Sequence, residues 1–348
     1  MNEIKVEIVA DSINQQGDRL TSLVLTYPRI IHAEMMTHRM FSRNASSSRA
    51  VPIQKMIEAV KNNTFCPFEF QKAHKGMQGS EYFTGQDKAD CIKLWLESAE
   101  LALQQAEKMK EKGITKQVIN RILEPYQYYT VLITGSKEGW DNFFELRNPL
   151  YEYKLGAETY YFKSWKELVS FIKSTTDNKD YIKSWEDETA IGKLQHNKGQ
   201  AEIHIMDLAE KIYDAVNEST PKKLAPNSWH IPFSNKIPFV GNLTESIDED
   251  NTYWKDYDEQ NKVKISVAMA ARTSYTVVGD EKEVDYERMI QLHDRLLSQD
   301  PPHSSPLEHC CVCVTDKDYN KSFKGEEKGW FRNYKGFKSY RQIIEESK

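Results

Sequence analysis

Two arginines frame a short run of small polar residues near the start of the sequence. The run Ser42-Arg43-Asn44-Ala45-Ser46-Ser47-Ser48-Arg49 combines hydroxyl, backbone N–H and guanidinium groups, which are the donors that phosphate oxygens accept from. A solvated serine-rich linker is the alternative interpretation. Helices are predicted on either side, which would keep the loop short and anchored, so we expect an anion-binding loop here.

A second candidate is Arg147, at the end of a helix that Ser136 is predicted to cap. At 100° per residue, Trp140, Phe143 and Phe144 share one face, and Arg147 falls between the two phenylalanines. An arginine in an apolar stripe must reach solvent, pair with a carboxylate, or bind an anionic or carbonyl-bearing ligand. Because Arg147 stands in the last turn, a local pair and a ligand contact both remain open.

Histidines supply two further candidates. Glu34 and His38 are four residues apart and share a helical face, as a tuned acid–base pair or as a surface pair. His303 and His309 flank a proline bend that contains Glu308. His309 precedes an apolar segment and is also compatible with a buried core position.

Three of the five cysteines follow these histidines, at Cys310, Cys311 and Cys313. Imidazole and thiolate groups suit zinc, but adjacent cysteines lack the two-residue spacer of common zinc motifs. A buried strand from Cys310 to Val314 is the interpretation that we favour, so we expect no metal. The odd number of cysteines argues against a disulfide framework.

Local patterns predict the elements that must position these residues. The predicted elements are strands at Ile4–Val9 and Leu20–Leu25 joined around Gly17, a helix at Ile30–Met40, a helix opened by Pro52, a helix from Asp87 to Lys112 ended by Gly113, a helix capped by Thr115 that contains Arg121, a strand at Tyr126–Thr134, the Ser136–Arg147 helix, and helices at Gln200–Val216 and Asp285–Ser298. The stretch from Ser219 to Asp258 is rich in proline and asparagine and predicts mostly loop.

The composition is that of a soluble globular protein. Hydrophobic residues make up 39% and charged residues 28% of 348 residues, which argues against a disordered or fibrous chain. The net charge of −5 argues against a broad nucleic-acid or anionic-membrane surface but allows a local basic pocket. No apolar run reaches the roughly 18–20 residues that span a bilayer, and the sequence opens without a secretory signal. We expect a cytoplasmic protein.

Together these segments resemble the flavin-dependent thymidylate synthase family. Its signature is Arg-His-Arg, seven residues, Ser, and an Arg two positions later; here Thr37-His38-Arg39 is followed by seven residues and then Ser47-Ser48-Arg49. Asn142-Phe143-Phe144-Glu145-Leu146-Arg147 resembles the family's helix whose Asn touches flavin and whose Arg contacts the uracil ring. Gln200-Ala201-Glu202-Ile203 resembles the segment that normally follows this Arg after a few residues, so 149–196 reads as an insertion.

Two further motifs stand in a different order from the family's. Ala270-Ala271-Arg272-Thr273-Ser274-Tyr275 and Ser305-Pro306-Leu307-Glu308-His309 resemble elements that normally precede the signature. The chain therefore resembles a circularly permuted member, which is feasible where termini lie close together. The implied fold is α+β, a central mostly antiparallel sheet with long helices. Residues 1–148 plus 197–348 would form the catalytic domain, and 149–196 a small inserted α/β module.

The resemblance implies reductive methylation of dUMP to dTMP with FAD, methylenetetrahydrofolate and NADPH, in a homotetramer whose sites are shared among subunits. Arg147 and Ser47 would lie at the reacting centre, where Arg147 polarises the pyrimidine. Ser47 is not expected to be the nucleophile, because no activating base stands near it in the sequence. The residues implied to bind dUMP are Glu34, Ser47, Ser48, Arg49, Arg121 and Arg147. The residues implied to bind FAD or folate are Thr37, His38, Arg39, Asn142, Ser274 and His309, with His309 stacking on folate.

Five positions depart from the family's pattern. Thr37 and Glu138 stand where the family has Arg, Glu34 where it has Gln, Ala45 where it has Glu, and Ala50 where it has Tyr. These departures leave two alternatives open. One is a related flavoenzyme that hydroxymethylates a pyrimidine deoxynucleotide, and the other is a non-catalytic nucleotide-binding homologue.

Overall fold

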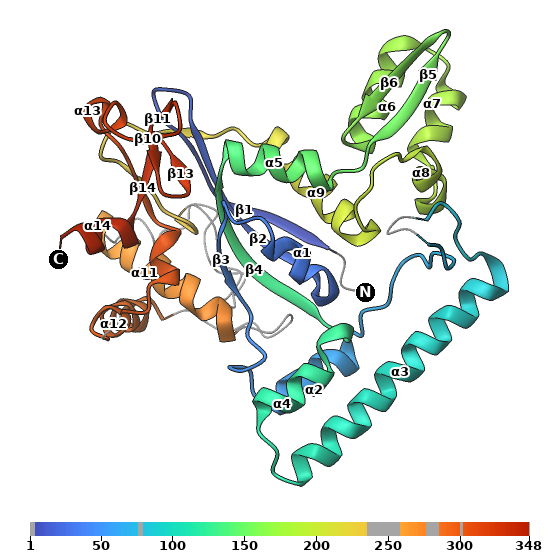
Figure 1. The fold of residues 1–348 in the computed structure, drawn as a ribbon, viewed down its shortest axis with the longest axis horizontal. Helices are drawn as coiled ribbons and strands as arrows, with labels where there is room; N and C mark the ends of the chain where they lie inside the picture. Colours follow the sequence, from blue (N-terminus) through green and yellow to red (C-terminus); the bar gives the residue numbers. More distant parts are fainter. Residues whose placement is uncertain (1–3, 76–78, 235–257, 276–284, 300–301, 348) are drawn as a thin grey trace.

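A five-stranded sheet forms the centre of the computed structural model, which describes residues 4–75, 79–234, 258–275, 285–299 and 302–347 (Figure 1). Its strands, in sheet order, are β3 (Ser42–Ala45), β4 (Tyr128–Ser136), β2 (Arg19–Pro28), β1 (Lys5–Ile13) and β7 (Lys222–Lys223). The pairs β3–β4, β4–β2 and β2–β1 are antiparallel, and β7 is parallel to β1. The expectation of a mixed α and β fold with a mostly antiparallel sheet is confirmed.

Helices surround the sheet, and shorter strands form small sheets and hairpins. The helices are α1 (His32–Met36), α2 (Ile53–Asn62), α3 (Gly85–Glu111), α4 (Lys116–Ile122), α5 (Lys137–Arg147), α6 (Trp165–Thr175), α7 (Lys179–Glu186), α8 (Ala190–His196), α9 (Ile203–Glu218), α11 (Glu259–Arg272), α12 (Tyr286–Leu297), α13 (Asp316–Tyr319) and α14 (Tyr340–Glu346), with single 3₁₀ turns η1 (Arg29–Ile31), η2 (Glu124–Tyr126), η3 (Thr273–Tyr275) and η4 (Ser305–Glu308). The remaining strands are β5 (Tyr151–Leu155), β6 (Glu158–Phe162), β8 (Trp229–His230), β9 (Cys311–Cys313), β10 (Phe323–Lys324), β11 (Glu327–Lys328), β12 (Trp330–Phe331), β13 (Tyr334–Lys335) and β14 (Phe337–Ser339).

The central strands are buried on both faces. Alternate residues of a strand point to opposite faces, and in β2 Leu23 and Leu25 pack in the core that includes α5 and α9. Val24 packs instead in a second core with α11 and α12. Figure 1 shows these two helix pairs on opposite sides of the sheet. Helices of the C-terminal part of the chain thus cover one face of the sheet that the N-terminal strands form.

Several predicted elements are confirmed because their signals are local. Thr115 caps α4 by accepting a hydrogen bond from the N–H of Gln117. The long helix α3 matches its predicted range to within two residues at each end, and Gly113 beyond its end adopts a φ of +76°, which favours glycine. Helix α2 begins directly after Pro52, as predicted, and α9 and α12 match their predicted ranges to within three residues at each end.

Three local predictions are wrong. The helix expected over Ile30–Met40 ends at Met36, because the Arg43 guanidinium donates to the carbonyls of Met36 and His38 and satisfies them from outside the helix. The first half of the predicted polar loop, Ser42–Ala45, is strand β3. Ser136 makes no side-chain cap; its Oγ accepts instead from the backbone N–H of Lys335.

Residues 149–196 form a β5–β6 hairpin with helices α6, α7 and α8, which project from the body in Figure 1. The segment has its own apolar cluster around Trp165 and Leu168. It is fastened to α9 by Glu210, whose carboxylate accepts from the Tyr151 hydroxyl and the Trp165 backbone N–H. That the segment is an insertion stays a prediction.

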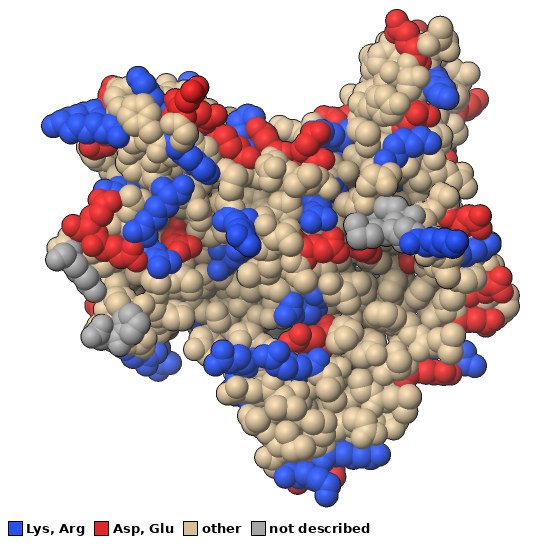
Figure 2. Space-filling view, viewed as in Figure 1, with Lys and Arg blue, Asp and Glu red and all other residues tan. Residues whose placement is uncertain are grey.

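Of the predicted 219–258 loop, residues 235–257 lie outside the described part of the chain. Among the described residues, no helix is both long enough and apolar enough to cross a membrane. Figure 2 shows acidic and basic side chains interspersed over the visible face.

Candidate functional site

The serine-rich segment and the end of α11 are bonded together although about 230 residues separate them. The Ser47 N–H donates to the carbonyl of Ser274 at 3.0 Å, and the Asn44 amide donates to the carbonyl of Ala270 at 3.2 Å. The Ser46 hydroxyl donates to the carbonyl of Thr273 at 3.4 Å. Two of the motifs singled out in the sequence thus form one surface.

A cavity of about 990 Å³ opens at this junction. It is lined by Ser47, Arg49, Ala50, Lys116, Ala271, Arg272, Ser274, Tyr275, Arg288, Met289, Leu292, Arg295, Leu296, Gln299 and His303. Four arginines and one lysine stand in this set, and no Asp or Glu belongs to the described lining. The cavity is therefore suited to an anionic ligand.

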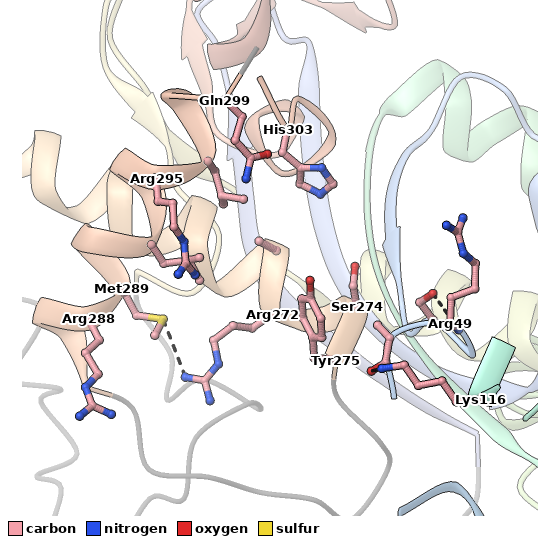
Figure 3. A pocket seen from close by; sticks show the side chains of 15 residues that line it. Arg49, Lys116, Arg272, Ser274, Tyr275, Arg288, Met289, Arg295, Gln299 and His303 are labelled. Atoms are coloured by element: carbon pink, nitrogen blue, oxygen red, sulfur yellow. Dashed lines mark hydrogen bonds between the residues drawn. The ribbon is translucent and has the colours of Figure 1, made fainter. Parts of the chain in front are cut away.

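Hydrogen bonds from helix α4 fix the backbone of the loop that carries Ser47 and Arg49. Asn120, fully buried on α4, donates to the carbonyls of Ser48 and Val51, and Lys116 donates to the carbonyl of Ala50. The backbone N–H of Arg49 donates to the Ser47 hydroxyl at 3.3 Å. With its backbone fixed, the exposed Arg49 side chain lies beside the cavity (Figure 3).

Two predicted phosphate ligands lie differently. Ser48 is buried beneath this loop. Arg121, on α4, donates to the carbonyl of Gln117 at 3.0 Å and is exposed. Neither side chain lines the cavity in this single chain.

Arg147 belongs to a second cluster. Its Nε donates to His38 Nε2 at 3.1 Å and its Nη1 to Glu34 Oε2 at 3.1 Å. Its Nη2 donates to the Thr37 hydroxyl at 3.4 Å. Four predicted site residues thus meet at the contact between α1 and α5. Of the alternatives open to Arg147, the structure shows the pair with a carboxylate, that of Glu34. None of the four lines the cavity at Arg49.

The electrostatics of this cluster favour a neutral imidazole. Burial, helped by Arg147 and Arg43, lowers the pKa of His38 to about 4. A neutral ring is also required by the bond from Arg147, since His38 Nε2 must accept. The ring packs edge-on against Phe143, with centroids 4.9 Å apart. Burial and the nearby Glu202 raise the pKa of Glu34, and Arg147 opposes this shift.

Three of the predicted flavin ligands have side chains that can donate hydrogen bonds. Thr37, Arg39 and Asn142 are exposed, and they offer hydroxyl, guanidinium and amide donors of the kind that flavin phosphates and ring carbonyls accept from. Glu138 pairs with Lys335 of the C-terminal segment at 3.2 Å.

His309 is a core histidine rather than a ligand. It is fully buried, with Nδ1 bonded to the Thr134 hydroxyl at 2.8 Å and Nε2 to Asn44 Oδ1 at 3.2 Å. Burial lowers its pKa to about 3. Because no part of the ring is exposed, the expected stacking on folate is corrected.

The same buried chain of hydrogen bonds continues across the sheet. Thr134 bonds to the Ser22 hydroxyl at 2.6 Å, and Ser22 bonds to His230 Nε2 at 2.8 Å. His230 Nδ1 bonds in turn to the Ser12 hydroxyl at 2.8 Å. Because Asn44 donates to Ala270, this chain orients the end of α11 beside the cavity.

Three of the five cysteines lie within four residues of one another. Cys310, Cys311 and Cys313 are buried, and burial raises the pKa of each thiol. The Cys310 thiol bonds to the Ser266 hydroxyl at 3.2 Å. No group of three or more potential metal ligands occurs among the described residues.

Three basic residues of the cavity lining were not singled out in the sequence, namely Lys116, Arg288 and Arg295. Arg288 and Arg295 carried a usable signal, since a spacing of seven places two residues on one helical face. His303 is exposed in the cavity while His309 is buried. Of the two histidines in that motif, His303 is the one accessible to a ligand.

No family model and no curated protein matches the chain. Similar solved structures include two of the UMP/dUMP methylase PolB from Streptomyces cacaoi, bound with 5-Br UMP and with 5-Br dUMP. The first is 16% identical, covers 56% of this chain and 97% of that chain, and has a TM-score of 0.35. The second is 13% identical, covers 63% of this chain and 91% of that chain, and has a TM-score of 0.40.

Proposed function

We propose that this protein is a flavin-dependent thymidylate synthase that converts dUMP to dTMP with methylenetetrahydrofolate and NADPH. The observation that carries the proposal is the bonding of Asn44, Ser46 and Ser47 to the carbonyls of Ala270, Thr273 and Ser274. Motifs that resemble the family's in permuted order meet in space, at a cavity whose described lining is cationic. A chance resemblance of separate segments gives no reason for such a meeting.

In this proposal Ser47 and Arg49 bind the 5′-phosphate of dUMP. A hydroxyl and an exposed guanidinium on a fixed loop can both donate to phosphate oxygens, and these charge-assisted bonds are strong. Ser48 would contribute through its backbone, since its side chain is buried. Arg121 would approach the phosphate only after releasing the carbonyl of Gln117.

Arg147 would polarise the uracil ring. A guanidinium has five N–H donors, and the bonds to His38, Glu34 and Thr37 occupy three of them. The others can donate to a pyrimidine carbonyl and stabilise the negative charge that develops when C5 becomes nucleophilic. Because the three partners fix the plane of the guanidinium beforehand, little reorganisation is needed on binding.

Thr37, Arg39 and Asn142, whose side chains are exposed, would hold FAD, with Ser274 contributing from the cavity. When bound, FAD passes the electrons of NADPH to the one-carbon unit. Methylenetetrahydrofolate supplies that unit at the oxidation level of formaldehyde, NADPH reduces it to a methyl group, and C5 gives up a proton. The chain's own task is to orient the uracil ring and exclude water.

The cluster at Arg49 and the cluster at Arg147 would be half-sites from different subunits of a homotetramer. Within one chain the two clusters do not share a cavity. Leu146, next to Arg147, is 57% exposed, and Met36, next to Thr37, is 46% exposed. Apolar groups at the edge of a polar cluster are typical of surfaces that pack against another subunit.

Mixing of inactive variants tests the shared site. At a dUMP concentration near the wild-type dissociation constant, Arg49→Ala and Arg147→Ala should each form little dTMP. Chains mixed equally before assembly should recover about a quarter of the wild-type activity, because that share of sites joins two intact half-sites. The Arg49→Ala/Arg147→Ala double variant, mixed with either single variant, should stay inactive. Failure of the first mixture to recover activity would refute the two-subunit site.

The product identifies the reaction. Mass spectrometry after incubation with dUMP, methylenetetrahydrofolate and NADPH should detect dTMP. 5-Hydroxymethyl-dUMP would instead identify a hydroxymethylase, and binding of dUMP without turnover in a flavin-free protein would identify a nucleotide-binding homologue. Either outcome would overturn the proposal.

A further inference from the structure

The cavity has two basic walls, and one nucleotide phosphate needs only one of them. Arg49 and Lys116 lie on one side, and Arg272, Arg288 and Arg295 on the other, as Figure 3 shows. The first wall comes from the loop after β3 and from α4. The second comes from α11 and α12, which belong to a separate part of the chain.

The second wall is extended. Arg288 and Arg295 are seven residues apart on α12, so their backbone positions are separated by about 10 Å along the helix. Both side chains are exposed, and Met289, Leu292 and Leu296 line the cavity beside them. Arg288 pairs with Asp285 at 3.2 Å, but Asp285 lies outside the cavity lining. Cations spaced along an apolar strip fit a ligand that carries several negative groups.

The size of the cavity also exceeds the need of one nucleotide. Its volume of about 990 Å³ stands at the upper end of the roughly 300–1,000 Å³ that small-molecule pockets span. Between the two walls stands Tyr275, whose side chain is exposed at 64%. An exposed aromatic ring at the centre of a binding cavity offers a stacking face for a planar heterocycle.

We propose that Arg272, Arg288 and Arg295 form a second anion subsite, which binds the carboxylate or phosphate tail of a co-bound molecule while its planar ring lies against Tyr275. This molecule is distinct from the nucleotide whose phosphate binds at Ser47 and Arg49. The inference rests on the proposed function only for the identity of that first ligand.

Two pairs of probes distinguish the sources of such a tail. One pair is 5-formyltetrahydrofolate with a single glutamate and with four, and the other is NAD⁺ and NADP⁺, which differ by one phosphate. Titration calorimetry of the full chain gives the dissociation constant of each probe and of dUMP. The test variant is Arg288→Gln/Arg295→Gln. The matched control is Lys262→Gln on α11, a basic residue outside the cavity lining.

The wild-type protein should bind the more charged member of at least one pair about tenfold more tightly, a difference of about 1.4 kcal/mol. The double variant should lose this preference while its dissociation constant for dUMP changes less than about twofold, within the spread expected of distant sites. The pair that shows the preference identifies the tail as carboxylate or phosphate, and Lys262→Gln should behave as wild type.

The inference is overturned if neither pair shows a charge preference, or if the preference survives in the double variant. It is also overturned if the double variant weakens the binding of dUMP as much as the binding of the charged probe, because the second wall would then bind the nucleotide phosphate. If dUMP does not bind at all but the preference exists and depends on the two arginines, the subsite stands and the proposed function fails.

Discussion

Replacement of Arg49 by alanine isolates the contribution of one charge to nucleotide binding. The side chain is exposed and makes no ion pair among the described residues, so its loss should leave folding stability within about 0.5 kcal/mol of wild type. A hydrogen bond to a charged group contributes about 1.5–3 kcal/mol. The dissociation constant for dUMP should therefore rise by about tenfold to 150-fold.

The assay compares dUMP with deoxyuridine, which lacks the phosphate. Calorimetry should show that deoxyuridine binds Arg49→Ala and wild type equally, since the lost contact involves only the phosphate. Arg288→Ala, on the opposite wall of the same cavity, serves as the matched control and should leave dUMP unchanged. The assignment of Arg49 to the phosphate would be refuted if Arg49→Ala weakened the binding of dUMP and of deoxyuridine equally. It would also be refuted if Arg49→Ala and Arg288→Ala weakened the binding of dUMP equally.

Three further predictions concern the buried network and the projecting segment. His309→Ala should lower the free energy of unfolding by about 3 kcal/mol or more, because it leaves a void in the core and unpaired groups at Thr134 and Asn44. The control is His303→Ala, at an exposed position of the ligand cavity, which should leave unfolding in urea unchanged. Burial lowers the pKa of His309 to about 3 and that of His230 to about 4, so below about pH 6.5 the unfolded chain binds more protons than the folded chain. The free energy of unfolding should therefore fall as the pH falls from 6.5 toward 4, by up to about 1.4 kcal/mol per pH unit for each histidine. A free energy of unfolding that urea titrations show to be independent of pH in this range would contradict the prediction. Deletion of residues 152–195 with a short linker should leave a soluble protein that unfolds cooperatively, since this segment packs around its own apolar cluster; an aggregated product would show that the segment belongs to the core.

The parts of the fold that could be predicted are those whose signals lie within one element. The apolar stripe of α3 and the Thr115 cap of α4 depend on neighbours a few residues away. The early end of α1 could not be predicted in this way, because the group that satisfies its last carbonyls is Arg43 in the next strand. Tertiary contacts decide such boundaries, and the local sequence does not encode them.

In the candidate site, too, some features could be predicted from the local sequence and others depend on tertiary contacts. The place of Arg147 on an apolar face left solvent, a carboxylate and a ligand as alternatives, and its pairing with Glu34 depends on the packing of α5 against α1. His303 and His309 belong to one motif, and no local feature says which of them is buried. His309 is the buried one because Thr134 on β4 and Asn44 on β3 form hydrogen bonds with its two ring nitrogens.

The motifs around Ser47 and Ser274 can form one site, although they lie far apart in the sequence, because a contact requires proximity in space and not adjacency in sequence. Alternate residues of β2, Leu23 and Val24, pack in separate cores, and the second core is completed by α11 and α12. A strand apolar on both faces must be covered on both, so the sequence run Leu23-Val24-Leu25 already requires a further layer of structure. The C-terminal helices supply that layer, and in doing so they bring Ser274 to Ser47. Burial of the sheet and assembly of the cavity are therefore one packing event, and a change that loosens α11 should weaken ligand binding and folding stability together.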